Sequence, residues 1–243
     1  MESLGVPRHK PKEETEARKY TGADSEILRG EKQAPFGIGG SGGGVVAQEK
    51  VTVVHNEKTR EVDLVTKYFK QLTGPDSLES AMSAFKLLKE AGVKHIPVTY
   101  RQVGPTEILM TDYNRDDKIA VGGNDNEKAK DLCINSVSNL PELLSSINED
   151  IQRATDAGIN IYTDCYFLII PKSGEETRID FVIGDLGGIG YANQDERSDL
   201  YSNNVKRVEY ALLSFISLHV NKKLQKEYAQ RIREWATSLE VEK

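Results

Sequence analysis

Short β-branched runs separated by polar residues dominate the first half of the sequence. Residues 45–47 and 51–54 are rich in valine and are predicted to form two strands. Residues 61–68 alternate polar with apolar side chains, so Leu64 and Lys67 are expected on opposite faces of a third strand. These three segments predict the beginning of an antiparallel sheet.

A helical pattern follows. Leu78, Met82, Phe85 and Leu88 recur at steps of four, three and three, which predicts a helix with one apolar face. Two further strands are predicted over residues 96–100 and 107–111, around a turn that contains glycine and proline. The first half is therefore expected to form a five-stranded antiparallel sheet with one helix.

Helical spacing dominates the second half. The apolar residues of one predicted helix are Leu140, Leu144, Ile147, Ile151 and Ala154, and Gly158 is its expected stop. Those of a later helix are Val205, Val208, Leu212, Phe215 and Ile216, and a last charged helix carries Trp235. Between these helices, residues 166–170 and 178–183 predict a hairpin.

The chain is therefore expected to be an α+β protein with three parts. Residues 1–35 are charged and contain few large apolar side chains, so they are predicted to be a flexible tail that serves docking or export. Residues 36–113 form the sheet-bearing lobe, and residues 114–243 form a smaller, mainly helical lobe. A length of 243 residues with 38% hydrophobic content is enough for two modest lobes or one large core.

Charge and cysteine content narrow the function classes. A net charge of −6 argues against a nucleic-acid partner, because such proteins usually carry a basic surplus. Cys133 and Cys165 are too few for a disulfide scaffold or a zinc site, which favours a reducing, cytoplasmic compartment. No window approaches the roughly 20 apolar residues of a membrane span, and the opening lacks the apolar core of a signal peptide.

A glycine-rich segment precedes the first strand. Gly37, Gly39, Gly40, Ser41 and Gly42 include the G-x-G-x-x-G pattern of dinucleotide-binding loops. That pattern requires a strand before the loop and a helix after it, whereas strand-like residues follow here. A glycine-rich hairpin that covers nucleotide phosphates fits better. The alternative is a flexible glycine-serine linker.

Three further fragments follow the glycine loop in order. Lys67 ends the sequence Leu-Val-Thr-Lys, Asp164 ends Tyr-Thr-Asp, and Asp185 lies in Gly-Asp-Leu-Gly. With the glycine loop, their order and spacing resemble a protein-kinase core over roughly residues 36–220, similar to that of minimal bacterial effector kinases. The resemblance implies a two-lobed fold that binds ATP and Mg²⁺.

The resemblance also implies roles in the first lobe. Lys67 would contact the α and β phosphates and pair with Glu79 of the following helix. Met110 would occupy the gatekeeper position, and Asp112 would lie in the hinge against which adenine rests. The alternatives are an exposed strand lysine, a capping box from Asp76 to Glu79, and an ordinary core strand around Met110.

In the second lobe the resemblance implies two acidic roles. Asp164 would accept or orient the proton of the substrate hydroxyl, and Asp185 would be the principal Mg²⁺ ligand. Asp180 competes for the metal role, although it lacks the glycines that follow Asp185. The alternatives are an exposed loop acid at 164 and a turn residue at 185. The sequence departs from the family with Tyr162 in place of histidine and Ile169 in place of the second metal-binding asparagine.

These expectations define the function to be tested. The first hypothesis is an atypical ATP-dependent kinase that phosphorylates a hydroxyl group, with a protein serine or threonine as the first choice of acceptor. The second is a pseudokinase that binds nucleotide or acts as a scaffold. The third is a small-molecule phosphotransferase, since few residues remain after Gly190 for a peptide-binding platform. The cytosol is the expected location, or a host cytosol if the protein is an effector, and the oligomeric state stays open.

Overall fold

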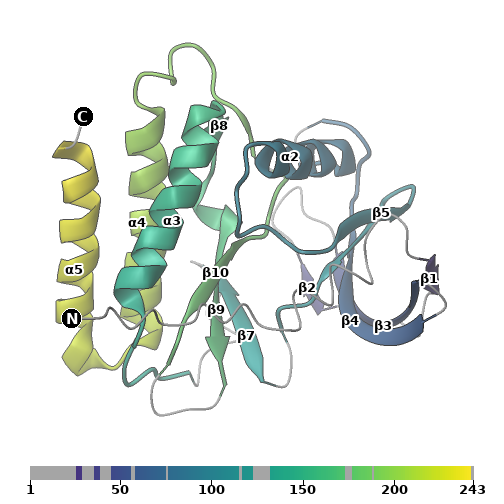
Figure 1. The fold of residues 1–243 in the computed structure, drawn as a ribbon, viewed down its shortest axis with the longest axis horizontal. Helices are drawn as coiled ribbons and strands as arrows, with labels where there is room; N and C mark the ends of the chain where they lie inside the picture. Colours follow the sequence, from purple (N-terminus) through teal and green to yellow (C-terminus); the bar gives the residue numbers. More distant parts are fainter. Residues whose placement is uncertain are drawn as a thin grey trace, which may run out of the picture. The chain divides into compact units, whose positions relative to one another are not determined.

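The computed structural model describes residues 26–28, 36–38, 45–55, 58–74, 76–114, 117–122, 132–172, 177–187 and 189–241. The chain divides into two compact units. The first comprises Met1–Tyr68 and Val98–Asp112, and the second comprises Phe69–Pro97 and Tyr113–Lys243. Figure 1 labels all four of the described helices and most of the strands.

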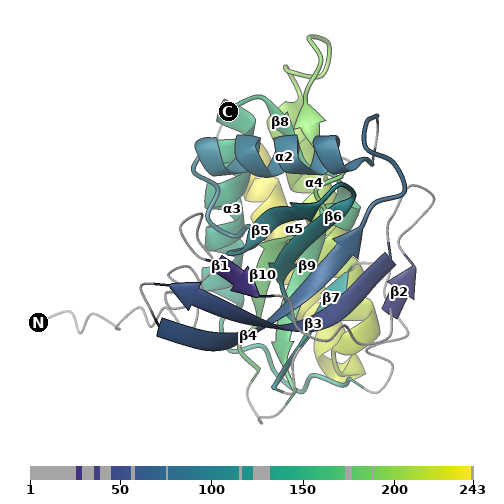
Figure 2. The same ribbon diagram turned by 90° about the vertical axis from the view of Figure 1, so that its right-hand side faces the viewer.

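The first unit contains an antiparallel sheet of which six strands are described. They are β1 (Glu26–Leu28), β2 (Phe36–Ile38), β3 (Val45–His55), β4 (Lys58–Tyr68), β5 (Tyr100–Gly104) and β6 (Glu107–Thr111). The order is β1-β3-β4-β6-β5, and β2 also pairs with β3. Figure 2 shows β1 and β2 near opposite ends of β3, in agreement with their registers.

The register of this sheet explains its burial pattern. Val51, Leu64 and Leu109 belong to one face and form a hydrophobic cluster, against which Val103 packs. Lys67 belongs to the opposite face, as the alternation of residues 61–68 predicted, and is half-buried. The opposite face is also partly covered, since Val65 and Ile108 on it are buried.

The prediction of a five-stranded sheet is wrong in its details. Residues 45–47 and 51–54 form one continuous strand, β3, because the polar residues between them also pair with β4. The strand expected at 96–100 begins only at Tyr100, and Pro97 lacks the N–H that a ladder needs. Part of the expected tail, Glu26–Leu28, is strand β1, and the rest of residues 1–35 lies outside the described part.

The second unit contains two small antiparallel sheets and the four described helices. The strands are β7 (Lys118–Gly122), β8 (Ile159–Asn160), β9 (Tyr166–Pro171), β10 (Asp180–Ile183) and β11 (Gly190–Tyr191). The helices are α2 (Leu78–Glu90), α3 (Leu140–Asp156), α4 (Leu200–His219) and α5 (Lys222–Val241). One sheet has the order β10-β9-β7 and the other pairs β11 with β8. In Figure 1, α3, α4 and α5 lie side by side.

The predicted helices of this unit are confirmed. All five apolar residues predicted for α3 are buried, and the helix ends before Gly158, whose φ of 72° favours glycine. The five apolar residues predicted for α4 are buried as well. On α2, however, Ala81 and Ala84 are buried, while Met82 and Phe85 are only partly covered. The buried face of α2 is therefore rotated relative to the prediction.

The two compact units also differ from the two lobes that the sequence predicts. The boundary after Asp112 lies within one residue of the expected boundary after residue 113. Helix α2 was expected beside the sheet of the first lobe, yet residues 69–97 group with the second unit. Among the helices of the described ranges, none is both long and apolar enough to cross a membrane.

Candidate functional site

Two of the predicted site residues lie at the same end of the β9–β10 hairpin. Asp164 is in a single 3-10 turn, η1 (Thr163–Cys165), which leads directly into β9. Asp185 follows the last residue of β10 by two positions. The amide of Gly184 donates a hydrogen bond of 2.9 Å to the carbonyl oxygen of Cys165, which joins the two segments. The hairpin therefore brings together two acids that are 21 positions apart in the sequence (185 − 164).

The side chain of Cys165 is influenced by the carboxylates of both Asp164 and Asp185. Its side chain is 1% exposed, and its Sγ lies 3.8 Å from Oδ1 of Asp164. Burial raises the pKa of the Cys165 thiol, and the negative charges of Asp164 and Asp185 raise it further. The thiol therefore stays protonated at neutral pH, which argues against a nucleophilic cysteine at this site.

Helix α4 supports the segment that precedes Asp164. Asn204 is fully buried, and its Oδ1 accepts a hydrogen bond of 3.0 Å from the amide of Ile161. Its Nδ2 donates to the carbonyl oxygen of Ile159 at 3.0 Å and to Oγ1 of Thr155 at 3.2 Å. Sequence reasoning missed Asn204, although a polar residue beside Val205 in the apolar stripe of α4 is a signal that could have found it.

Helix α2 contacts the segment that follows Asp185. Oγ of Ser80 donates a hydrogen bond of 2.7 Å to the carbonyl oxygen of Gly187. A Cβ on Gly187 would lie 3.3 Å from both Cα and Oδ1 of Asp76, which itself has a φ of 54°. Because the nearest atom belongs to the backbone, only glycine fits without a shift at position 187. The start of α2 therefore packs directly against the residues that follow Asp185.

Glu79 lies beside this contact, in the first turn of α2, where its side chain is exposed. The N-cap of the helix is Ser77, whose side chain accepts a hydrogen bond of 3.1 Å from the amide of Ser80. The alternative capping box from Asp76 to Glu79 is therefore wrong, since the third helical position is Ser80.

The sheet of the first unit carries the remaining described site residues. In the β4–β6 register Lys67 faces Ile108 and Val65 faces Met110, so Lys67 and Met110 lie at diagonal positions on one face. Asp112 directly follows β6 and is 3% exposed. Lys67, Met110 and Asp112 belong to the first unit, whereas Glu79, Asp164 and Asp185 belong to the second.

Only part of the glycine-rich segment can be placed. Gly37 is the central residue of β2, which pairs with the beginning of β3. Gly39, Gly40, Ser41 and Gly42 lie outside the described residues. The phosphate-binding role predicted for this segment therefore stays a prediction.

The hairpin register separates the two candidate metal ligands. Asp180 pairs with Ile169 at the end of the hairpin away from Asp185, and its Oδ1 accepts a hydrogen bond of 2.8 Å from the amide of Phe181. Ile169 is itself buried within β9. Position 169 therefore supplies no metal ligand, and Asp185 is placed better than Asp180 to act together with Asp164.

The donor set fits a nucleotide-bound Mg²⁺. Within the described ranges, no group of three or more His, Cys, Asp or Glu side chains is arranged to hold a metal ion. Mg²⁺ commonly takes only one or two protein carboxylates, because phosphates and water complete its octahedral shell. Asp164 and Asp185 suit this arrangement better than they suit a metal site made of protein ligands alone.

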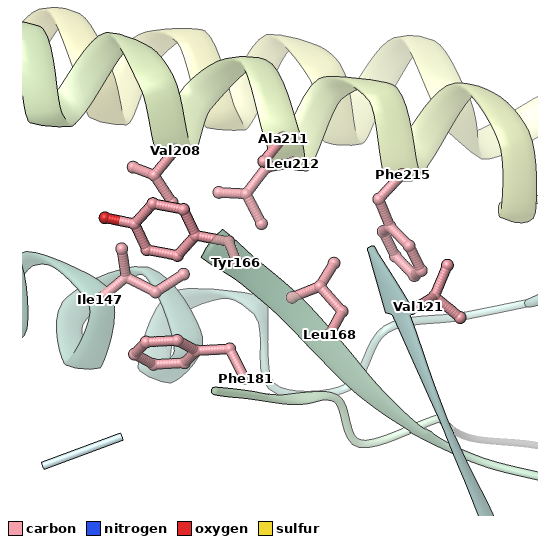
Figure 3. Close-up of a pocket in the computed structure, with 9 residues that line it drawn as sticks. All are labelled: Val121, Ile147, Tyr166, Leu168, Phe181, Val208, Ala211, Leu212 and Phe215. Atoms are coloured by element: carbon pink, nitrogen blue, oxygen red, sulfur yellow. The ribbon is translucent and has the colours of Figure 1, made fainter. Parts of the chain in front are cut away.

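A small cavity of about 10 Å³ lies elsewhere in the second unit, between the β7-β9-β10 sheet and helices α3 and α4. Its lining residues, shown in Figure 3, are Val121, Ile147, Tyr166, Leu168, Phe181, Val208, Ala211, Leu212 and Phe215. The Tyr166 hydroxyl is buried without a hydrogen-bond partner among the described residues. The cavity has room for about one water molecule and is too small for a nucleotide.

Comparisons with known proteins assign no family to this chain. No protein-family model matches the sequence. No curated protein matches it significantly either. The inference of function therefore rests on the residues and contacts described above.

Proposed function

We propose that this protein is an atypical ATP-dependent kinase that transfers the γ-phosphoryl group to a hydroxyl, with a serine or threonine of a protein as the acceptor. The observation that carries the proposal is the pair of aspartates at one end of the β9–β10 hairpin. Asp164 and Asp185 flank the Gly184–Cys165 hydrogen bond, and both charges act on the Cys165 thiol. Paired acids, one for the hydroxyl and one for the metal, suit phosphoryl transfer.

We assign Asp164 to the hydroxyl group of the acceptor substrate. Its side chain is exposed, so a substrate hydroxyl can approach it, and a carboxylate at this position can accept or orient the proton. We assign Asp185 to the metal, since it lies at the same end of the hairpin as Asp164. Bound Mg²⁺ would neutralise charge on the β and γ phosphates.

Lys67 is assigned the nucleotide phosphates. A half-buried lysine on a central strand is a compact positive charge with less water around it than at a free surface, which strengthens its attraction for phosphate. Met110 shares its face of the sheet and is assigned the adenine, together with Asp112. The phosphate-binding role of the glycine-rich segment and the pairing of Glu79 with Lys67 stay predictions.

The test is transfer of labelled γ-phosphate from MgATP to a generic protein acceptor and to the protein itself. Lys67→Ala, Asp164→Asn and Asp185→Asn are each expected to lower transfer at least about a hundredfold without unfolding the protein. Asp180→Asn is the matched control, because it removes an acid from the other end of the same hairpin. Equal activity in wild type and all three site variants would overturn the assignment.

One observation favours a second candidate, a nucleotide-binding module without turnover. The position of the second metal-binding asparagine is occupied by the buried Ile169, and only Cys165 separates Asp164 from β9. Titration with ATP, with and without Mg²⁺, distinguishes the two candidates. Tight binding without transfer to any acceptor would support the module.

The acceptor class follows from the same assay. The exposed carboxylate of Asp164 is open to the hydroxyl of a small molecule as well as to that of a protein. ATP consumption is therefore also measured with sugars, aminoglycosides and choline. Consumption that requires one of these compounds, and no protein acceptor, would replace the protein-kinase proposal with a small-molecule phosphotransferase.

A further inference from the structure

Arg207 of α4 contacts three consecutive residues that lead to Asp164. Its Nη1 donates a hydrogen bond to Oδ1 of Asn160 and lies 3.4 Å from the carbonyl oxygen of Ile161. Its guanidinium carbon is 4.4 Å from the centre of the Tyr162 ring. One side chain therefore contacts an amide side chain, a backbone carbonyl and an aromatic face in sequence.

These partners are all neutral. Among the described residues, no carboxylate forms a salt bridge with Arg207. The guanidinium also lies near enough to the buried Tyr166 hydroxyl to oppose the rise in the pKa of Tyr166, which burial causes. A planar guanidinium can hydrogen-bond in its plane and stack on a ring at the same time, which lysine cannot do. The contacts of Arg207 therefore fix the orientation of its neighbours and do not neutralise a charge.

The neighbouring support of α4 is of a different kind. Asn204, one turn earlier, binds the backbone of Ile159 and Ile161. Arg207 contacts the side chains of Asn160 and Tyr162 in addition to the carbonyl oxygen of Ile161. Because Tyr162 is 42% exposed, little else restricts its ring on the solvent side. Without the guanidinium, Tyr162 would regain rotamer freedom two residues before Asp164.

We propose that Arg207 is a positioning residue for Asp164, acting through Asn160, Ile161 and Tyr162. The inference rests on the proposed function, because it assigns Arg207 to the reaction that Asp164 serves. A misplacement of about 1 Å in a reacting group can cost on the order of a hundredfold in rate. The expected effect is therefore on the chemical step and not on nucleotide binding.

The test compares Arg207→Met and Arg207→Lys with wild type in the labelled-phosphate assay. Both variants are expected to lower kcat, on the order of tenfold to a hundredfold for Arg207→Met and less for Arg207→Lys, with KM for ATP within about twofold. Arg231→Met is the matched control. Arg231 also lies over a tyrosine ring, that of Tyr228, but at 6.0 Å and on α5.

Two readouts separate positioning from a purely structural role. Added guanidinium ion, at concentrations that leave wild type unchanged, is expected to restore part of the kcat of Arg207→Ala. In the Asp164→Asn background, Arg207→Met is expected to cost little more, because residues that act as one unit are not additive. The proposal would be overturned if Arg207→Met lowered kcat by the same factor in the Asp164→Asn background as in wild type. It would also be overturned if unfolding of Arg207→Lys explained the whole of its loss of activity.

The outcomes for Arg207 and for the proposed function are distinguishable. If wild type transfers phosphate and Arg207→Met keeps the wild-type kcat, the positioning role is wrong and the kinase proposal stands. If wild type transfers no phosphate to any acceptor, the kinase proposal fails and the role of Arg207 fails with it.

Discussion

Nδ1 of His95 lies 2.7 Å from Oδ2 of Asp150, a carboxylate on α3 that is 1% exposed. The same carboxylate accepts hydrogen bonds of 2.9 Å from the amides of Lys94 and His95 and from Nη1 of Arg153. The His95 ring also stacks on Phe181 of β10, with the ring centres 4.1 Å apart. Asp150 therefore fastens the segment after α2 to α3, and His95 joins that segment to β10 of the hairpin.

Asp150→Asn is expected to destabilise the second unit by about 3 kcal/mol at neutral pH, because the buried donors lose a charged acceptor. Burial would raise the pKa of Asp150, but the hydrogen bonds from His95 and from the two amides outweigh it and lower that pKa. A lowered pKa contributes stability above the ordinary value of 3.8 and loses it as the pH falls through the folded value.

Denaturant unfolding at pH 7 and at successively lower pH tests this prediction. The difference between wild type and Asp150→Asn should shrink as the pH falls below about 3.8. Glu149→Gln is the control, since Glu149 is exposed and its ion pairs with Lys94 and Arg153 are expected to contribute less than about 1 kcal/mol. A pH-independent difference would contradict the role of the Asp150 charge.

Asn204→Ala is expected to cost about 2–4 kcal/mol, because it leaves the amide of Ile161 and the carbonyl oxygen of Ile159 buried without their partner. Thermal and denaturant unfolding measure the loss. Asn203→Ala, at the neighbouring and partly exposed position, should stay within about 0.5 kcal/mol of wild type. An equal loss at both positions would contradict the role of the buried amide, since alanine favours the helix more than asparagine does.

Gly187→Ala is expected to destabilise the protein by about 1–3 kcal/mol and to lower phosphate transfer. The added methyl group meets the backbone of Asp76 at 3.3 Å, so either the start of α2 or the segment after Asp185 must move. Gly190→Ala is the matched control, because a Cβ there meets no atom within 4 Å. Unchanged unfolding and unchanged transfer in Gly187→Ala would show that the contact between positions 187 and 76 has room for a methyl group.

Tyr166→Phe is expected to be neutral or stabilising by up to about 1 kcal/mol, because it removes a buried hydroxyl that lacks a partner among the described residues. Tyr228→Phe supplies the opposite case, since its buried hydroxyl accepts a hydrogen bond of 3.0 Å from the amide of Val137. That variant should lose about 1 kcal/mol. A comparable loss in Tyr166→Phe would indicate a bound water in the cavity of Figure 3.

Local pattern was sufficient for the larger elements of the second unit. Helices α3 and α4 carry their apolar residues at 3.6-residue spacing, and each is long enough for that period to be evident. The hairpin of β9 and β10 was predicted as well, although β10 begins at Asp180 rather than at residue 178. Short-range signals are reliable here because the partner of each residue is nearby in the sequence.

Short strands escaped prediction because their stability is not local. Strands β1 and β2 have three residues each and exist by pairing with β3. No strand was predicted where β7 lies, and its partner β9 begins more than 40 residues later. A strand of three to five residues carries too little pattern to be distinguished from a loop, so the pairing partner decides.

For the candidate site, the sequence determined the identity and order of Asp164 and Asp185, because the first ends the fragment Tyr-Thr-Asp and the second lies in Gly-Asp-Leu-Gly. Only the tertiary structure decided that they lie at one end of the hairpin, that Asp180 lies at the other, and that Asn204 and Arg207 hold the segment before Asp164. Side-chain contacts between a helix and a loop more than 40 positions apart have no periodic signature in the sequence. They arise only when packing brings a specific donor within reach of a specific acceptor.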